Sequence, residues 1–336
     1  MAVDNKVIDS TQNFLYAKLV DQVVTGTYIN QMFLKGTKPW GGAQEEIPIK
    51  WQRNTQGGSF AGADVLSTSI VDNTVKMTFD AKFVYQPSNL TMTDLALNDT
   101  EMARASLMDR QVQSDGADMS VMVATQLYSD GTGNSSKDLT GIAAAIDDGT
   151  SVATYGSLSR ATYTSLNATV TASGGTLTLA KMFTMWDTLQ QDQQQPSVIL
   201  TTKAVRSLYE QLLTPNIRYA SWTKMGIGAS RDGLVFREAA VIGDSAATAQ
   251  KMWFINEDTF EFKALKKWYK GTPIKYGLDQ MEGEPNNANP MGLGFFATDW
   301  VTPVNQMTVN KFVVLGGNLM CNNPRYNGVL TGITGI

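Results

Sequence analysis

Histidine is absent from this chain of 336 residues, and cysteine occurs once, as Cys321. Without histidine there is no Ser-His or Cys-His pair for nucleophilic catalysis, no imidazole base near neutral pH and no histidine ligand for a metal. A single cysteine excludes an intrachain disulfide and a cysteine-based zinc site. We expect Cys321 to be a small buried residue. These absences exclude most of the familiar kinds of enzyme chemistry.

Charge is also scarce. Charged residues make up 17% of the sequence, below the ~25% of ordinary globular proteins. The formal net charge of −4 counts against a basic face that binds nucleic acid. Two explanations of the low charge remain open: other subunits cover much of the surface, or the surface is made polar by Thr, Ser, Asn and Gln.

Long hydrophobic runs are missing as well. The first fourteen residues contain no apolar segment of signal-peptide length, and no window of ~18 apolar residues predicts a membrane span. Hydrophobic residues nevertheless make up 43% of the chain, which is enough for a real core. The length predicts about two domains at ~150 residues each.

The N-terminal quarter predicts a helix followed by a long hairpin. Apolar residues recur with helical spacing over residues 12–33, behind Ser10 as a candidate N-cap, and the pattern ends near Gly36. Strict alternation then predicts two strands, one around residues 47–51 and one over residues 75–85. Residues 53–73 between them are rich in Gly, Ser, Thr and Asp. So long a polar connection is unusual in a compact domain and is often functional.

The period changes in the next segment, which predicts one long helix over residues 100–128. Its apolar stripe steps by three, four or seven residues and consists of Ala105, Met108, Val112, Gly116, Met119, Val123 and Leu127. Gly131 and Gly133 follow and end the helix. Gly116 lies on the stripe and indicates a close backbone contact or a bend.

The second half predicts a mixed layer of helices and strands. Helices are expected over residues 177–195 and from the cap Thr202 to Leu213, on either side of a short buried strand at residues 197–201. Strands are expected at residues 234–236, 240–242, 252–255 and 260–265, a loop at 271–289, and a final strand pair at 307–315 and 318–321. The fold class predicted by this order is α+β.

Four short segments resemble motifs of tailed-bacteriophage major capsid proteins. The first is Asp130-Gly131-Thr132-Gly133 after the long helix, and the second is Tyr155-Gly156-Ser157-Leu158-Ser159-Arg160, in which Ser157-Leu158-Ser159 replaces the commoner Gly-Ile-Asp. The third is the Pro196–Thr202 strand before a helix that contains Tyr209. The fourth is the ending from Val313 to Tyr326, which is similar to a "Gly-Asn-Leu…Asn-Pro-Arg" pattern. Their common order extends along nearly the whole chain.

This resemblance implies the Hong Kong phage capsid fold. Residues 1–40 would form an N-terminal arm, 41–90 an extended hairpin called the E-loop, and 91–176 a peripheral domain with a spine helix and a glycine-rich segment. Residues 177–250 would form an axial domain, and 251–336 strands that complete both domains. The implied function is a major capsid protein that self-assembles into pentamers and hexamers of an icosahedral shell around the phage genome.

The resemblance also implies partners and a location. The chain would associate with itself and with portal, scaffolding and decoration proteins. The DNA would be enclosed without sequence-specific binding, and no membrane would take part. It would reside in the virion and, during assembly, in the host cytoplasm. Two alternatives stay open: an encapsulin-like nanocompartment shell of the same fold, and a carbohydrate-binding or adhesive β-rich protein.

No catalytic, cofactor-binding or metal-binding residue is predicted, and we expect no enzyme. The dinucleotide-like start Gly226-Ile227-Gly228 lacks the strand-to-helix context of a nucleotide site. The acidic pairs Glu45/Glu46, Asp147/Asp148 and Glu282/Glu284 lie in sequence that does not bring neighbouring carboxylates together. Lys50 and Lys82 flank the hairpin and either contact acidic groups of a neighbouring subunit or lie on a solvated face.

Overall fold

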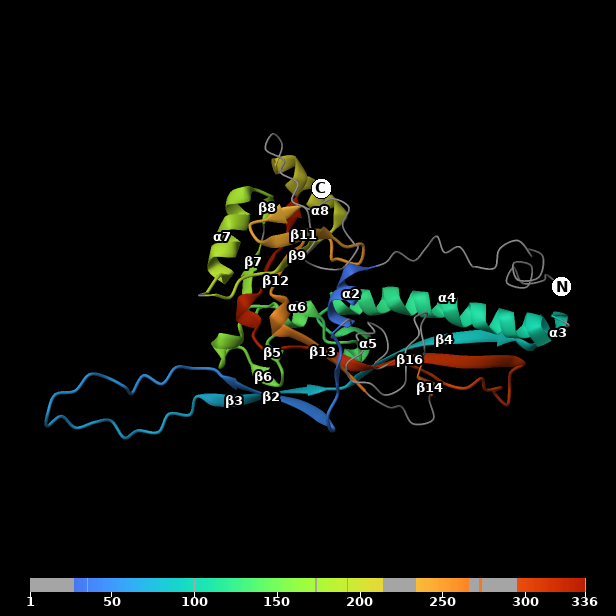
Figure 1. Cartoon of the computed structure of the whole chain (residues 1–336), viewed down its shortest axis with the longest axis horizontal. Coiled ribbons are helices and arrows are strands. Elements are labelled where there is room, and N and C mark those ends of the chain that lie inside the picture. The colour runs from blue at the N-terminus through green and yellow to red at the C-terminus, as the bar shows by residue number, and fades with distance from the viewer. Residues whose placement is uncertain are drawn as a thin grey trace.

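The computed structural model of the chain describes residues 27–34, 36–98, 101–172, 174–191, 193–213, 234–265, 272–273 and 295–335. Two six-stranded sheets, three two-stranded sheets and the helices between them make up this part, so the α+β class is confirmed. Figure 1 shows helix α4 lying along one sheet, helices α7 and α8 beside the other, and a hairpin that extends far from the body.

The first sheet is built around one long strand, β16 (Thr308–Cys321). On one side β16 pairs antiparallel with β4 (Lys82–Thr91), from Thr308 opposite Thr91 to Gly317 opposite Lys82. On the other side it pairs with β13 (Phe260–Ala264) and β15 (Phe295–Ala297). Two-residue strands, β1 (Lys38–Pro39) and β14 (Thr272–Pro273), complete the sheet at its edges.

The final strand pair expected from the sequence is wrong, because β16 continues through Gly316 and Gly317 without a turn. Both glycines allow close approach of neighbouring groups. A Cβ at Gly317 would lie 2.5 Å from the carbonyl oxygen of Lys263, and a Cβ at Gly316 would lie 2.8 Å from a methyl carbon of Leu265. These glycines therefore accommodate packing instead of reversing the chain.

The second sheet has the strand order β10-β11-β9-β12-β17-β7. Its central strand β9 is buried at every residue and pairs parallel with β11 and antiparallel with β12. Helices α7 and α8 lie over this sheet and close a separate core that contains Trp186, Val205 and Phe254. The strands are β7 (Thr169–Thr171), β9 (Val198–Thr201), β10 (Val235–Phe236), β11 (Ala239–Gly243), β12 (Met252–Ile255) and β17 (Gly328–Leu330), and the helices are α7 (Leu179–Leu189) and α8 (Lys203–Leu213).

Helix α7 is shorter than expected. It ends at Leu189, because Gln190 is extended and Gln191 forms an isolated antiparallel bridge with Gln194. The glutamines beyond it serve tertiary contacts: the side chain of Gln194 accepts a hydrogen bond from Asn256, and that of Gln195 donates one to Glu238. A run of glutamines has good helix propensity, and here these contacts override it.

The long helix is confirmed as α4 (Glu101–Leu127), 27 residues without a break. Met119, Val123 and Leu127 of its predicted stripe are buried, whereas Met108 and Val112 are half-buried. The buried half packs into the main core with residues of the first sheet such as Phe262 and Leu315. The stripe therefore faces the sheet, as the periodicity predicted.

The predicted N-terminal helix lies mostly outside the described residues, and its described end is α2 (Tyr28–Leu34). This short helix is held by a buried carboxylate: Asp244 accepts hydrogen bonds from the backbone N–H of Ile29, at 2.9 Å, and from the hydroxyl of Tyr128, at 3.2 Å. The amide of Asn30 donates to the carbonyl of Ser120 in α4. Helix α2 is thus fixed to α4 and to the second sheet.

Short elements connect the sheets. They are β2 (Gln44–Lys50), β3 (Thr74–Asp80), α3 (Met92–Leu97), α5 (Gly133–Ser136), α6 (Ile142–Ala145), β5 (Thr154–Tyr155), β6 (Leu158–Ser159), η1 (Thr164–Leu166), β8 (Gly175–Thr176), η2 (Glu257–Thr259), η3 (Pro324–Tyr326) and β18 (Ile333–Thr334). No helix in the described part of the chain is both long enough and apolar enough to cross a bilayer.

Candidate functional site

The hairpin is the most exposed part of the described chain. Strands β2 and β3 pair antiparallel from Gln44 opposite Asp80 to Lys50 opposite Thr74, and Figure 1 shows the connection between them, in blue and cyan, reaching away from the body. This connection exposes four large apolar side chains: Phe60 by 66%, Val65 by 98%, Leu66 by 58% and Ile70 by 99%. Apolar groups gathered on an extended segment indicate a contact with another surface.

The second strand of the hairpin ends earlier than the sequence predicted. Alternation continues from Val75 to Tyr85, but β3 ends at Asp80 and β4 begins at Lys82 in the first sheet. The carbonyl of Asp80 accepts a hydrogen bond from the amide of Asn318, at 2.9 Å, and this contact holds the junction. Two consecutive strands have the same period of two, so the pattern could not reveal the change of partner.

The Tyr-Gly motif lies against the base of this hairpin. Gly156 and Ser157 have positive φ angles of 55° and 63° and form the two-residue turn between β5 and β6. The carbonyl of Gly156 accepts a hydrogen bond of 2.9 Å from the backbone N–H of Thr78 in β3. A Cβ on Gly156 would lie 2.7 Å from the Cβ of Met77. The motif therefore supplies a close backbone contact for the hairpin.

Arg160 at the end of the motif is fully buried. Its guanidinium donates hydrogen bonds to the carbonyls of Ala144, Ala145, Asp147 and Leu166 and lies 5.3 Å from the ring centroid of Tyr155. Burial lowers the pKa of Arg160, an effect that the charge of Asp147 opposes, and an arginine stays charged in any case. One side chain thus joins the segment before the motif to the segment after it.

Tyr155 connects the motif to both the hairpin and β16. Its ring meets Phe79 of β3 edge-on, with centroids 5.4 Å apart, and its hydroxyl accepts a hydrogen bond of 2.9 Å from the backbone N–H of Cys321. Burial raises the pKa of Tyr155 well above its ordinary value and that of Cys321 to about 12. Cys321 is a buried thiol, as expected, and not a reactive thiolate.

Ion pairs fix the first strand of the hairpin. The Nζ of Lys263 in β13 lies 2.6 Å from a carboxylate oxygen of Glu45, and both side chains are largely shielded from solvent. The backbone N–H of Gly41 donates to the other oxygen of Glu45, at 2.5 Å. Burial acts to raise the pKa of Glu45, but these hydrogen bonds and the charge of Lys263 lower it below its ordinary value. Glu46 instead pairs with Lys76 across the hairpin, on the exposed face.

A second apolar surface lies on the first sheet. Helix α4 covers the face that carries Val84 and Leu90 of β4. The alternate residues Phe83 and Tyr85 are exposed by 49% and 61%, and Phe312 of β16 is exposed by 39% beside them. The rings of Tyr85 and Phe312 meet edge-on, with centroids 6.1 Å apart. We call these three residues, Phe83, Tyr85 and Phe312, the aromatic strip.

The candidate chemical residues do not converge on one site. The carboxylate of Asp147 is buried and accepts hydrogen bonds from the backbone N–H groups of Gly149 and Val152, whereas Asp148 is exposed and accepts from Thr150. Glu282/Glu284 and Gly226-Ile227-Gly228 lie outside the described residues. Over the described ranges, no three His, Cys, Asp or Glu side chains are grouped as metal ligands would be. Lys82 donates to the carbonyl of Ser136 within the chain, and Lys50 is exposed.

Asn318 was not recognised from the sequence as a structural residue. Its side-chain oxygen accepts hydrogen bonds from the backbone N–H of Thr140 and of Leu319, and its amide group donates to Asp80 and to the hydroxyl of Thr140. It therefore joins the end of the hairpin, the segment after α4 and β16. Its place in the Gly-Asn-Leu segment was the available signal, because an asparagine between buried residues needs hydrogen-bond partners.

Comparisons with known proteins show which solved structures have a similar fold. No protein-family model matches the chain, and no curated protein matches it. Among solved structures, the capsid asymmetric unit of cyanophage A-1(L) is similar with a TM-score of 0.68 at 14% identity, covering 96% of this chain and 97% of that chain. The capsid of Myoviridae phage XM1 is similar with a TM-score of 0.56 at 10% identity, covering 99% of both chains.

An encapsulin is similar too. The holo-SrpI encapsulin complex from Synechococcus elongatus PCC 7942 has a TM-score of 0.60 at 10% identity, with 99% of this chain and 96% of that chain covered. The likeness extends over almost the whole length of each structure, so it includes the hairpin, both sheets and α4. The chain therefore has the major capsid fold of tailed bacteriophages, which this encapsulin shares.

Proposed function

We propose that this chain is the major capsid protein of a tailed bacteriophage and that it acts by self-association. The observation that carries this proposal is the hairpin, whose connection exposes Phe60, Val65, Leu66 and Ile70 away from its own body. A capsid fold with an apolar segment projecting from it is suited to cover a neighbouring subunit. The chain would build pentamers and hexamers of an icosahedral shell.

Assembly in this proposal is driven by burial of apolar surface that one subunit leaves exposed. The hairpin connection and the aromatic strip are two such surfaces, and a permanent interface of this kind buries ~2,000 Å² or more. The net charge of −4 would limit adhesion of the packaged DNA to the shell. The DNA is then enclosed without sequence-specific binding.

The same proposal includes the domain boundaries, the partners and the location of the protein. Residues 1–40 are the N-terminal arm, 41–90 the E-loop, 91–176 the peripheral domain, 177–250 the axial domain, and 251–336 the strands that complete these domains. Portal, scaffolding and decoration proteins are the partners, and the protein is found in the virion and, during assembly, in the host cytoplasm. The chain performs no catalytic step, so shells treated with a chelator and a thiol alkylator keep their mass and diameter.

Shortening the hairpin tests the proposal. Replacing residues 56–69 by a two-residue turn removes exposed residues only and leaves β2 and β3 in place. We expect a folded subunit that forms no stable shells, measured by circular dichroism and electron microscopy of the overexpressed chain. A matched variant with Phe60→Ser and Leu66→Ser keeps the length of the connection and should also lose shells. Normal particles from the shortened chain would reject the role of the hairpin.

An encapsulin-like nanocompartment is the second candidate, favoured by the similarity to the SrpI encapsulin. The content of particles isolated from the native source separates the two: packaged DNA supports the phage shell, and a protein cargo supports the nanocompartment. A carbohydrate-binding β-rich protein is less favoured, because the chain contains a 27-residue helix and two further helices of 11 residues.

A further inference from the structure

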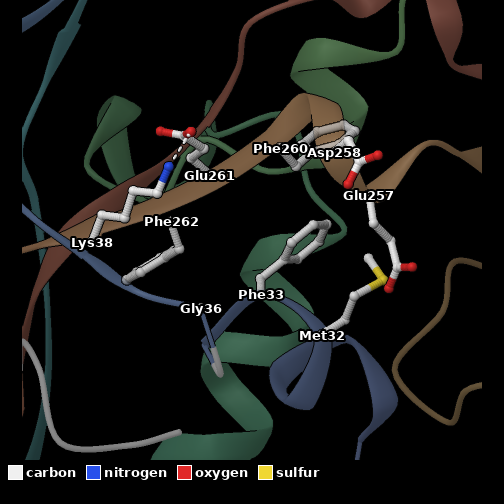
Figure 2. A pocket seen from close by; sticks show the side chains of 9 residues that line it. All are labelled: Met32, Phe33, Gly36, Lys38, Glu257, Asp258, Phe260, Glu261 and Phe262. Carbon is white, nitrogen blue, oxygen red and sulfur yellow. Dashed lines mark hydrogen bonds and ion pairs between the residues drawn. The ribbon is translucent and has the colours of Figure 1, made fainter. Parts of the chain in front are cut away.

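A cavity of about 250 Å³ opens between helix α2 and strand β13. Figure 2 shows it close by, with the rings of Phe33 and Phe260 near each other at a tilt and Phe262 on the side of Lys38. The ring centroids of Phe33 and Phe260 are 5.4 Å apart. The three phenylalanines line the cavity but are buried, so little of their ring surface is exposed in it.

The described residues that line the cavity include more carboxylates than cations. Among the residues that line the cavity, Glu257, Asp258 and Glu261 are acidic and Lys38 is basic. Lys38 is already neutralised, since its Nζ lies 2.5 Å from a carboxylate oxygen of Glu261. Within the described ranges, neither Glu257 nor Asp258 has a cation at ion-pair distance. Among the described residues that line it, the pocket therefore carries an excess of negative charge.

Glu257 is the less solvated of the two free carboxylates. It is half-buried and accepts a hydrogen bond of 3.1 Å from the hydroxyl of Ser197. Burial raises the pKa of Glu257, and the charge of Asp258 raises it further. A cation placed in the pocket would oppose both effects on the pKa of Glu257, because it would stabilise the ionised carboxylate.

The chemistry of the pocket fits an arginine. A guanidinium is planar and donates to two carboxylates at once, whereas an ammonium group is a more strongly hydrated point charge. The hairpin offers such a group. Lys76 is paired with Glu46 and Lys82 with a carbonyl, but Arg53 is exposed in the connection and makes no ion pair with the described residues.

We propose that this pocket receives the Arg53 side chain from the hairpin of a second copy of the chain. This inference rests on the proposed self-association and specifies one of its contacts. Apolar residues of the connection supply contact area, and the charge pair sets where the hairpin lies on the neighbour. The pocket is close to the base of the hairpin of its own subunit, because β13, which supplies Phe260 and Phe262, also carries Lys263, the ion-pair partner of Glu45 in β2.

Charge exchange tests the pairing. The single variants Asp258→Arg and Arg53→Asp each place like charges in the contact, and both positions are exposed, so the subunit should fold. We expect each to lower the yield of shells at least about tenfold, which corresponds to ~1.4 kcal/mol. A chain with both changes should recover shells, because each hairpin again meets an opposite charge in the next pocket. Sedimentation of the assembled fraction measures the yield.

Two controls make the result specific. Asp109→Arg is the control for Asp258→Arg, because it makes the same change of charge at an exposed position of α4. Lys50→Asp is the control for Arg53→Asp, because it replaces a cation by a carboxylate at a neighbouring exposed position of the hairpin. We expect Asp258→Arg to rescue Arg53→Asp but not Lys50→Asp. Rescue of Lys50→Asp instead, or normal shells from Asp258→Arg alone, would overturn the pairing while leaving the shell function intact. A wild-type chain that forms no shells would overturn both.

Discussion

The backbone N–H of Thr78 donates a hydrogen bond of 2.9 Å to the carbonyl oxygen of Gly156. This bond joins the hairpin to the Tyr-Gly turn, which lies far from it in the sequence. Next to this bond, the ring of Tyr155 packs against the ring of Phe79, and the guanidinium of Arg160 packs against the ring of Tyr155. The direction in which the hairpin leaves the body therefore depends on a chain of contacts that ends at one buried arginine.

Gly156→Ala should loosen the base of the hairpin. The added Cβ would lie 2.7 Å from the Cβ of Met77, at a φ of 55° that side chains rarely adopt. We expect a loss of roughly 1–3 kcal/mol in the free energy of unfolding, measured by urea denaturation. Ser157→Gly is the matched control in the same turn, and it should be neutral or stabilising, because glycine accepts the φ of 63° without strain. Equal losses from both variants would contradict this explanation.

Arg160→Met should be more damaging. It keeps a long side chain but removes the donors to the carbonyls of Ala144, Ala145, Asp147 and Leu166. Each buried carbonyl left without a donor costs roughly 1–3 kcal/mol, so the variant should be insoluble or have a much lower midpoint of unfolding. Arg160→Lys keeps the charge but cannot reproduce the planar fork, and it should not restore wild-type stability. A stable Arg160→Met subunit would show that the cluster does not support the fold.

A charge introduced on the apolar stripe of α4 should be more damaging where the stripe is more deeply buried. Val123 is fully buried and Val112 is half-buried. Val123→Asp should give insoluble protein, because an unpaired carboxylate in the core costs several kcal/mol, and Val112→Asp should give a smaller loss. Asp109→Asn, on the exposed side, should behave as wild type. The soluble fraction after expression measures all three, and equal solubility of the two valine variants would mean that the stripe does not face the sheet.

The ion pair between Glu45 and Lys263 should make the hairpin base sensitive to acid. The pKa of Glu45 is lower in the folded protein than its ordinary value of about 4.3. Its contribution is therefore present above the unfolded pKa and is lost as the pH falls through the folded pKa. Glu45→Gln should be less stable than wild type at pH 7, and the two should converge toward pH 3. Glu46→Gln, whose carboxylate lies in an exposed pair, should show little of this difference.

Much of the architecture could be predicted from the sequence because its signals are periodic. The stripe on α4, the alternation in β2 and β3, and the buried strand β9 all report directly which face is covered. The changes of partner could not be predicted this way. The apolar alternation continues across the junction at Asp80, and β16 has no alternation around Gly316 and Gly317, because it is buried at every residue from Val313 to Cys321. The junction also depends on a residue distant in sequence, Asn318.

The functional residues were predictable only in part. The Tyr-Gly motif identified Tyr155 and Arg160, but not that they support the hairpin, because the partners Phe79 and Thr78 come from another segment. The pocket between α2 and β13 had no signal in the sequence, since Phe33 and Phe260 read as ordinary core residues and their acidic neighbours as surface.

Electron cryomicroscopy of the particles formed by the expressed chain is the sharpest test of self-association through the hairpin. We predict closed icosahedral shells in which the hairpin connection, with Phe60 and Leu66, lies over a neighbouring subunit. Hairpin density that folds back on its own subunit, or a chain that stays monomeric at concentrations used for assembly, would contradict it.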